Sequence, residues 1–370
     1  MAEKGTIETL ENEIKKIEEN ASKFLFFVVD TKGMPAGVLS YEYDIALQLK
    51  KLGYNVEMIH NEKEFVGVKD WLGEEYAELP HLDIEKDSVL VSPSDVLFIP
   101  EMCAGVMAQT KTLACKRVAI LHSLSYLVDS VTLGASWSDL RINECIAATE
   151  NLAKKAKEFF PGVRTHVIRP AVQDYFFEEA EKPQQLIINL ILKDNSTLNQ
   201  VLKPFYWKYP IYGWVAFRPI NKNVSRKDFA KALKESFATI WVDDNTDIGY
   251  SALEAMASGN LVIGKIPENA PEWLIDENGE PNNAGLWFYG AYDSQELIAS
   301  AFQSFLTNTI PDSIYKQARA TAEKYTTKQQ EVDIKEHIIK GILEERKQEL
   351  RVAVGIQRQE EENNKKENAE

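Results

Sequence analysis

The sequence predicts an α/β protein made of two doubly wound domains, with helical extensions at both ends. Three observations lead to this fold class. The chain has 370 residues, which suits two domains of ordinary size. Short apolar runs alternate with helix-like segments, as expected for strands that are buried on both faces of a parallel sheet. A polar segment rich in Glu, Lys and Gln, residues 178–185, divides this alternation into two series and predicts an interdomain linker.

Composition and charge exclude several classes of protein. Hydrophobic residues make up 44% of the chain, which excludes global disorder. The formal net charge of -15 argues against a groove for nucleic acid. The 5 histidines show no metal-ligand spacing, so we expect neither a metal nor a cofactor. The 3 cysteines form no disulfide framework. With no signal-peptide pattern and no transmembrane segment, we expect a cytoplasmic protein.

The first expected element is a charged N-terminal helix within residues 1–22. Its apolar residues recur at spacings of three and four: Ile7, Leu10, Ile14, Ile17 and Ala21. A stripe of under three heptads is marginal alone and needs a partner surface. That surface belongs either to the chain's own domain or to another chain, so a homo-oligomer or a partner protein bound through the terminal helices is one interpretation.

The N-terminal domain is expected over residues 23–177. Short apolar runs predict its strands, and a turn that contains Gly37 leads from the first strand into an amphipathic helix over 38–52. A second, Lys-rich helix is expected over 151–159. The strands are predicted at 24–29, 55–60, 96–100, 117–122, 146–149 and 165–169.

The C-terminal domain is expected over residues 186–325. Its strands are predicted at 186–192, 211–215, 238–242, 261–264 and 285–289, and its helices at 226–236, 251–258, 294–306 and 311–324. A long helix over 326–357 should pack back across the domain interface, and residues 358–370 are expected to form a disordered charged tail.

Residues 241–273 carry the most informative motif. They predict a strand, a tight Gly turn, a helix of about two turns and another strand, which places the helix N-terminus at the ligand crevice of a parallel sheet. Gly249 would allow close backbone approach, and the N–H groups near Tyr250 and Ser251 would hold a diphosphate. Glu254, one turn into the helix, would accept hydrogen bonds from both hydroxyls of a ribose.

This motif resembles the C-terminal signature of retaining glycosyltransferases of the GT-B fold, in the "group 1" or family 4 class. That signature is E-G-F-G, four residues, then E-A-M-A-x-G, and Gly249 and residues 253–259 match it. The likeness covers most of residues 24–325; its clearest parts are residues 32–60, 117–125, 146–177 and 224–244. It implies two Rossmann-like domains, an N-terminal domain for the acceptor and a C-terminal domain for a nucleotide sugar.

The resemblance also implies an activity. A hexosyltransferase-like enzyme of this kind moves a sugar from a nucleotide-diphosphate donor, with UDP, GDP or ADP, to an acceptor hydroxyl with retention and without a metal. Glu254 would bind the ribose of the donor. His122 ends a strand at the edge of the crevice, where it would touch the donor sugar or the leaving phosphate. Gly37 would allow close approach of the donor. The sequence leaves the acceptor unknown.

Two departures from the family pattern bear on catalysis. Thr246 stands where the first Glu of the signature is expected, and Asp247 beside it is a candidate substitute. The usual Arg and Lys after the first strand of the C-terminal domain have no clear counterparts. Lys193, Lys203 and Arg218 are therefore the candidate phosphate ligands.

Three other interpretations stay open. A GT-B-derived binding or structural protein without catalysis would explain the two departures. A nucleotide-sugar epimerase would release free UDP when no acceptor is present. Asp243, Asp244 and Asp247 follow an apolar strand and also fit the metal-binding DxD motif of a GT-A transferase. The Gly turn, helix and strand that follow are typical of GT-B instead.

Overall fold

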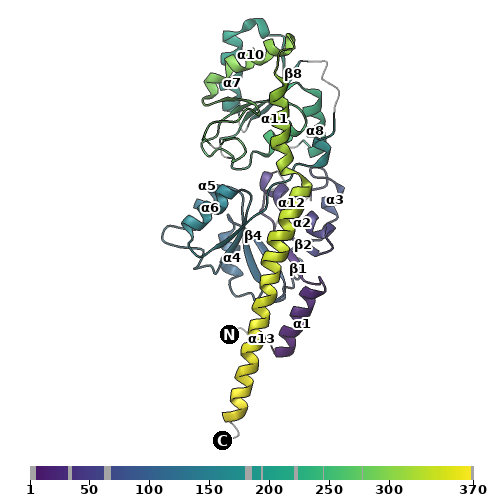
Figure 1. Ribbon diagram of the computed structural model, residues 1–370, viewed down its shortest axis with the longest axis vertical. Coiled ribbons are helices and arrows are strands. Elements are labelled where there is room, and N and C mark those ends of the chain that lie inside the picture. The colour runs from purple at the N-terminus through teal and green to yellow at the C-terminus, as the bar shows by residue number, and fades with distance from the viewer. Residues whose placement is uncertain are drawn as a thin grey trace.

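The computed structural model describes residues 6–31, 36–61, 68–179, 186–192, 195–220, 224–244, 246–276 and 278–367. Figure 1 shows two α/β lobes stacked along the long axis of the molecule. The first half of the chain forms the lower lobe, and the following residues form the upper lobe. A long C-terminal helix runs from the upper lobe down the side of the lower lobe and beyond it.

The lower lobe is the N-terminal domain. In the described part of the chain its sheet has 7 parallel strands in the order β3-β2-β1-β4-β5-β6-β7. Largely apolar sequences make the central strands of this sheet, because both of its faces are covered by helices. The strands are β1 (Lys23–Phe27), β2 (Asn55–His60), β3 (His81–Asp83), β4 (Val96–Pro100), β5 (Lys116–Leu121), β6 (Glu144–Ala147) and β7 (Arg164–Val167). The helices are α2 (Gly37–Lys51), α3 (Glu74–Ala77), α4 (Ala104–Gln109), α5 (Leu124–Asp129) and α6 (Glu150–Phe159).

The upper lobe is the C-terminal domain, with a separate sheet of 5 parallel strands among the described residues. The order is β12-β11-β10-β8-β9. Strand β9 is added on one side of β8, and the strands from β10 onward are added on its other side, so the strand order reverses between β8 and β10. Such a switch point opens a ligand crevice at the carboxyl ends of the strands. The strands are β8 (Ile187–Leu192), β9 (Ala216–Pro219), β10 (Ala238–Val242), β11 (Leu261–Lys265) and β12 (Leu286–Phe288).

Two cores cover the faces of this second sheet. Side chains of α7 (Asn195–Lys208) and α10 (Ser294–Leu306) pack on one face. Side chains of α8 (Arg226–Glu235), α9 (Tyr250–Ala257) and α11 (Asp312–Ala322) pack on the other. Two separate sheets agree with the expected two-domain organisation. Most of the predicted linker lies outside the described residues, so its boundaries stay predictions.

The C-terminal helix is built from α12 (Thr327–Asp333), a π-helical segment (Ile334–Leu343) and α13 (Glu344–Glu367). It packs back onto the N-terminal domain, as expected, and Ile334, Ile338 and Ile342 are buried in the core of that domain. Gly341 allows this close contact, because a Cβ at that position would lie 3.1 Å from Cε1 of His166.

Two expectations from the sequence are wrong. The strand expected at 211–215 is a 3-10 turn (Pro210–Tyr212), and β9 begins only at Ala216, because Pro210 and Gly213 favour a turn. The disordered tail expected from residue 358 is helical to Glu367. Residues 357–367 contain no Gly or Pro and are rich in Gln, Glu, Lys and Arg, which have high helix propensity.

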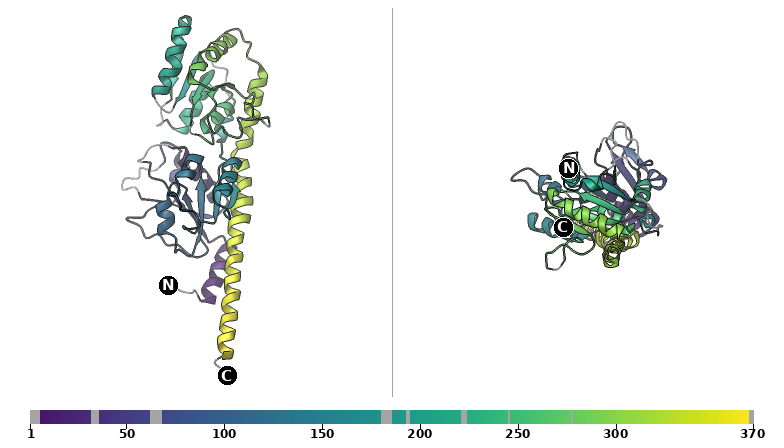
Figure 2. Two further views of the ribbon diagram at one scale, coloured as in Figure 1. Left: turned by 90° about the vertical axis from the view of Figure 1, so that its left-hand side faces the viewer. Right: turned by 90° about the horizontal axis from the view of Figure 1, so that it is seen from above.

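The N-terminal helix α1 (Ile7–Glu18) lies alongside α13 in both side views (Figures 1 and 2). Ile17 is buried, and Glu18 pairs with Arg351 of α13 at 2.8 Å. The partner surface for the apolar stripe therefore comes from the same chain, and the structure gives no support to oligomerisation through this helix. Among the described residues, none of the helices combines the length and the apolar composition needed to cross a bilayer.

Candidate functional site

Among the described residues, polar contacts join the two domains, and three of them come from loops or helix starts that follow strands of the C-terminal domain. Arg226 of the C-terminal domain pairs with Asp44 of α2. Asp247, after β10, accepts a hydrogen bond from the backbone N–H of Leu124. Glu272 accepts a hydrogen bond from the backbone N–H of Glu150. The crevice that the fold predicts is thus lined by side chains that hold the two domains together.

The glycine turn of the motif has the predicted strand–turn–helix layout. Gly249 has a left-handed φ of 68° and precedes α9, which no side chain caps. A Cβ at Gly249 would lie 2.7 Å from the ring of Trp273, whose indole N–H donates to the carbonyl of Ile248. Thr246 accepts a hydrogen bond from the N–H of Gly249 at 2.8 Å. Packing against Trp273 therefore requires glycine at this position.

Glu254 is buried in the crevice and faces a guanidinium from its own domain. Its carboxylate lies 3.6 Å from Nε of Arg226. Burial raises the pKa of Glu254 to about 7, although the charge of Arg226 opposes that shift. Arg226 is itself buried and donates to both oxygens of Asp44, at 3.0 and 3.2 Å. An Asp44–Arg226–Glu254 network therefore joins the domains where the ribose is expected.

Tyr250 and Ser251 lie in the first turn of α9, and both are half-buried. The Tyr250 ring lies beside Arg226, with the guanidinium carbon 5.9 Å from the ring centroid. The Tyr250 hydroxyl is buried and has no hydrogen-bond partner among the described residues. A buried orphan hydroxyl is costly unless a ligand or water pairs with it. This corner of the crevice therefore has an unused hydrogen-bonding group.

His122 directly follows β5 and is held between two buried carboxylates. Its Nδ1 lies 2.7 Å from Glu101, and its Nε2 lies 3.3 Å from Glu42. Burial alone would lower the pKa of the imidazole, but Glu101 and Glu42 outweigh it and raise the pKa of His122 to about 10. Both nitrogens of the ring face acids of the same domain, which favours its protonated form, while burial raises the pKa of Glu42 as well.

Asp247 lies close to His122 in space. Its Oδ2 accepts the backbone N–H of Leu124, two residues after His122, at 3.0 Å. Burial raises the pKa of the Asp247 carboxyl; the N–H of Leu124 opposes this shift, and Glu101 adds to it. The structure thus brings the two predicted catalytic residues, one from each domain, to the same part of the crevice.

The remaining predicted site residues lie elsewhere or stay untested. Gly37 is the first residue of α2, and a Cβ there would meet no atom within 4 Å. Arg218 is bonded to Asn189 and Glu235 near the end of α8, so it does not join the Glu254 network. Lys203 is exposed on α7. Lys193 lies outside the described residues.

The sequence analysis missed the buried partners in the crevice. Glu42 and Asp44 stand within a run of large apolar residues in α2, and acids in such a run are a signal of a buried polar cluster. Arg226 gave no signal, because it follows the N-cap Ser225 and looks like an ordinary solvated helix residue. Glu101 directly follows β4, as His122 directly follows β5, and this position at the end of a buried strand is the signal that could have identified it.

The alternative GT-A metal motif is not formed. Asp244 pairs with Lys265, and Asp247 is bonded to Leu124. In the part of the chain that the structure describes, no group of three or more His, Cys, Asp or Glu residues is placed to hold a metal ion.

Comparisons with known proteins agree with this architecture. No family model and no curated protein matches the chain, but solved structures do. A glycosyltransferase from Rickettsia africae ESF-5 matches with a TM-score of 0.62 at 16% identity, over 87% of this chain and 98% of its own. The pneumococcal O-GlcNAc transferase GtfA, in complex with UDP and GlcNAc, matches with a TM-score of 0.60 at 10% identity, over 88% and 99% of the two chains.

A third structure, Anabaena HepE in complex with UDP and glucose, matches with a TM-score of 0.62 at 13% identity, over 86% and 99%. The chain has a GT-B fold. This confirms the fold class expected from the sequence. At identities this low the GT-B likeness establishes architecture alone.

Proposed function

We propose that this GT-B protein is a glycosyltransferase that moves a sugar from a nucleotide-diphosphate donor to an acceptor hydroxyl with retention. The observation that carries the proposal is Glu254, a buried carboxylate one turn into an uncapped helix at the crevice. The motif around it resembles that of the retaining family. Three solved structures of similar fold support it: one is a glycosyltransferase, and two hold UDP with GlcNAc or glucose.

The donor would bind at α9. Glu254 would accept the two ribose hydroxyls, the N-terminal turn of α9 would hold the diphosphate, and the Tyr250 hydroxyl would supply a further hydrogen bond. For the donor to bind there, Arg226 would have to break its contact with Glu254. That contact is 3.6 Å long, whereas its bonds to Asp44 start at 3.0 Å. Arg226 can therefore leave Glu254 and still keep Asp44, which makes it a candidate cation for the donor site among the described residues.

The transfer would proceed on one face of the sugar. The acceptor oxygen bonds to the anomeric carbon as the bond from that carbon to the diphosphate oxygen breaks, and the hydroxyl proton passes to the departing diphosphate. The helix N-terminus and Arg226 would stabilise the growing negative charge. Asp247 would position the sugar in place of the missing Glu, and the imidazolium of His122 would lie beside the leaving group.

Two further features belong to the proposal. The reaction is metal-independent, as in the family that the sequence resembles. The three cysteines, Cys103, Cys115 and Cys145, are all free, which suits a reducing compartment and supports a cytoplasmic location.

A non-catalytic GT-B protein is the second candidate. It is favoured by two observations. Glu254, His122 and Asp247 each already contact a group of the same chain. Thr246 in place of the acidic residue points the same way.

A donor screen separates the two candidates. UDP-, GDP- and ADP-sugars would be tested by thermal shift, since a ligand at 100 times its Kd stabilises by about 2.7 kcal/mol. Diphosphate release with acceptors, and the anomeric configuration of the product by NMR, would then be measured. We expect one nucleotide class to bind and to give a retained product. Failure of every donor to bind would reject the glycosyltransferase.

A further inference from the structure

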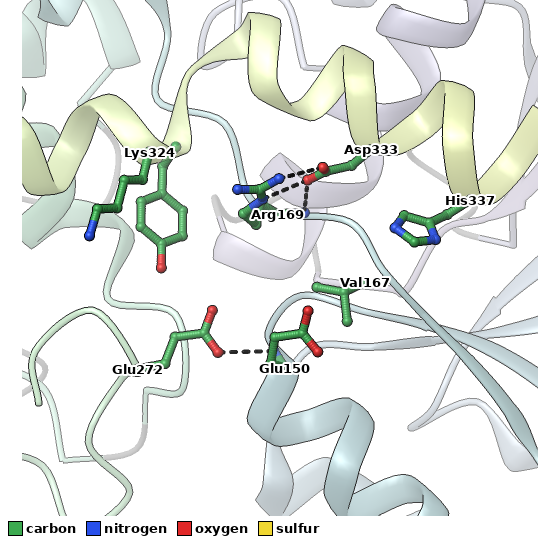
Figure 3. Close-up of a pocket in the computed structure, with 8 residues that line it drawn as sticks. Glu150, Val167, Arg169, Glu272, Lys324, Asp333 and His337 are labelled. Atoms are coloured by element: carbon green, nitrogen blue, oxygen red, sulfur yellow. Dashed lines mark hydrogen bonds and ion pairs between the residues drawn. The ribbon is translucent and has the colours of Figure 1, made fainter. Parts of the chain in front are cut away.

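A cavity of about 340 Å³ lies where the two domains and the C-terminal helix meet (Figure 3). Its volume falls in the range of small-molecule sites, roughly 300–1,000 Å³. Its walls come from the start of α6, the end of β7, a loop after β11 and the start of the C-terminal helix. None of the donor contacts proposed above uses these residues.

One wall of the cavity carries basic side chains. Arg169 is fixed by Asp333, to which its Nη2 and Nε donate at 2.6 and 2.8 Å, and this pair leaves its Nη1 unused. Lys324 and His337 lie on the same side. Burial and the neighbouring His166 lower the pKa of His337, so its ring is neutral and offers one donor and one acceptor.

The opposite wall carries acids (Figure 3). Glu272 accepts the backbone N–H of Glu150 at 3.0 Å, which fixes the C-terminal domain loop on the N-terminus of α6. The Glu150 side chain is exposed and lines the cavity. The side chains of Tyr325 and Val167 also line the cavity.

The opposite charges on the two facing walls restrict the net charge of a ligand that can bind in the cavity. A simple anion would face Glu150 and Glu272, and a simple cation would face Arg169 and Lys324. A neutral polyhydroxylated molecule fits both walls, because its hydroxyls donate to carboxylates and accept from guanidinium and ammonium groups. Its C–H face would pack on the Tyr325 ring.

The cavity also flanks the reacting part of the crevice. Trp273, next to Glu272, donates to the carbonyl of Ile248 in the glycine turn. Glu150 begins the helix after β6, and β6 pairs with β5, which leads into His122. The walls of the cavity are therefore connected to the elements that carry Asp247 and His122.

We propose that this cavity binds a neutral sugar, which serves as the acceptor. The role as acceptor rests on the proposed function, whereas the binding of a neutral sugar does not. The test uses the full chain and ligand-observed NMR with glucose and N-acetylglucosamine. Glucuronate, glucose 6-phosphate and glucosamine serve as charged probes of similar size.

Two variants and two matched controls make the test specific. Lys324→Met and Glu150→Gln each remove one charge from the cavity, and the Glu272 bond to the Glu150 backbone is kept. Each should weaken binding of the neutral sugar by about 5- to 10-fold. Lys328→Met on the same helical stretch and Glu158→Gln on α6 should leave the affinity unchanged, since neither residue lines the cavity.

The outcomes separate this inference from the proposed function. Preferential binding of a charged probe, no binding of either neutral sugar, or equal affinity in the variants and the wild type would each overturn the neutral-sugar site. Nucleotide-sugar binding would be measured on the same samples. If neutral sugars bind as expected while no nucleotide sugar binds, the acceptor role falls together with the proposed function, and the sugar site stands.

Discussion

Gly249 shows how one residue of the motif is fixed by packing. Its left-handed φ and its contact with Trp273 both exclude a side chain. We expect Gly249→Ala to lower the free energy of unfolding by about 1–3 kcal/mol. Urea denaturation measures this loss. Gly134→Ala is the control, because Gly134 has a similar φ of 85° but no atom within 4 Å of a Cβ. Equal losses in the two variants would contradict the packing explanation.

The raised pKa of His122 predicts that the free energy of unfolding depends on pH. Its pKa is about 10 in the folded state and 6.5 as the ordinary value, so the folded state binds the proton more tightly. The stabilisation is therefore complete below pH 6.5 and is lost as the pH rises towards 10, by at most about 1.4 kcal/mol per pH unit.

Unfolding experiments between pH 7 and 9 would test this loss against His122→Gln, which should reduce the slope. The raised pKa of Glu254, about 7, acts mainly below this window, between 4.5 and 7. An unchanged slope in the variant would show that His122 is not the titrating group.

Local sequence patterns predicted part of the candidate site. The motif around Gly249 and Glu254 was located because its turn, helix and strand are neighbours in the sequence. The Arg226–Asp44 pair joins residues 182 positions apart, and Asp44 stands out in its apolar helix whereas Arg226 does not. Such a pairing depends on how the domains meet, which local periodicity does not encode.

Among the secondary-structure elements, the C-terminal helix depends most on tertiary contacts. Ile338 of its π-helical segment is buried in the core of the N-terminal domain, although the other residues of that core lie far from Ile338 in the sequence. Ile338→Ala should therefore lower the free energy of unfolding by about 2–5 kcal/mol. Val352→Ala on α13 is the control, since Val352 is 63% exposed and should change stability by less than about 0.5 kcal/mol. Equal effects in urea denaturation would show that the helix is not part of this core.

Strand and helix positions followed from the sequence wherever the apolar pattern was strong. The strands at 55–60 and 96–100 and the helix at 294–306 have the expected bounds. The pattern failed at 211–215, where aromatic residues suggested a strand but Pro210 and Gly213 set a turn. It failed again after residue 357, where a polar composition hid a strong helix propensity.

At the scale of the whole molecule, the GT-B arrangement places Glu254 between the domains. Arg226, Asp247 and Glu272 each contact the N-terminal domain, so these residues join the two domains near Glu254. Donor binding at Glu254 therefore requires local rearrangement of Arg226, and the affinity of the donor includes the free energy of that change.

The measurement that tests the central claim most directly is calorimetric titration of the tightest-binding nucleotide sugar into the wild type and Glu254→Gln. If Glu254 holds the ribose, the variant replaces one acceptor oxygen with a donor, and the affinity should fall roughly 10- to 150-fold. Glu280→Gln, an exposed acid in the same domain, should bind like the wild type. A Glu254→Gln protein that is folded and binds the donor as tightly as the wild type would contradict the account.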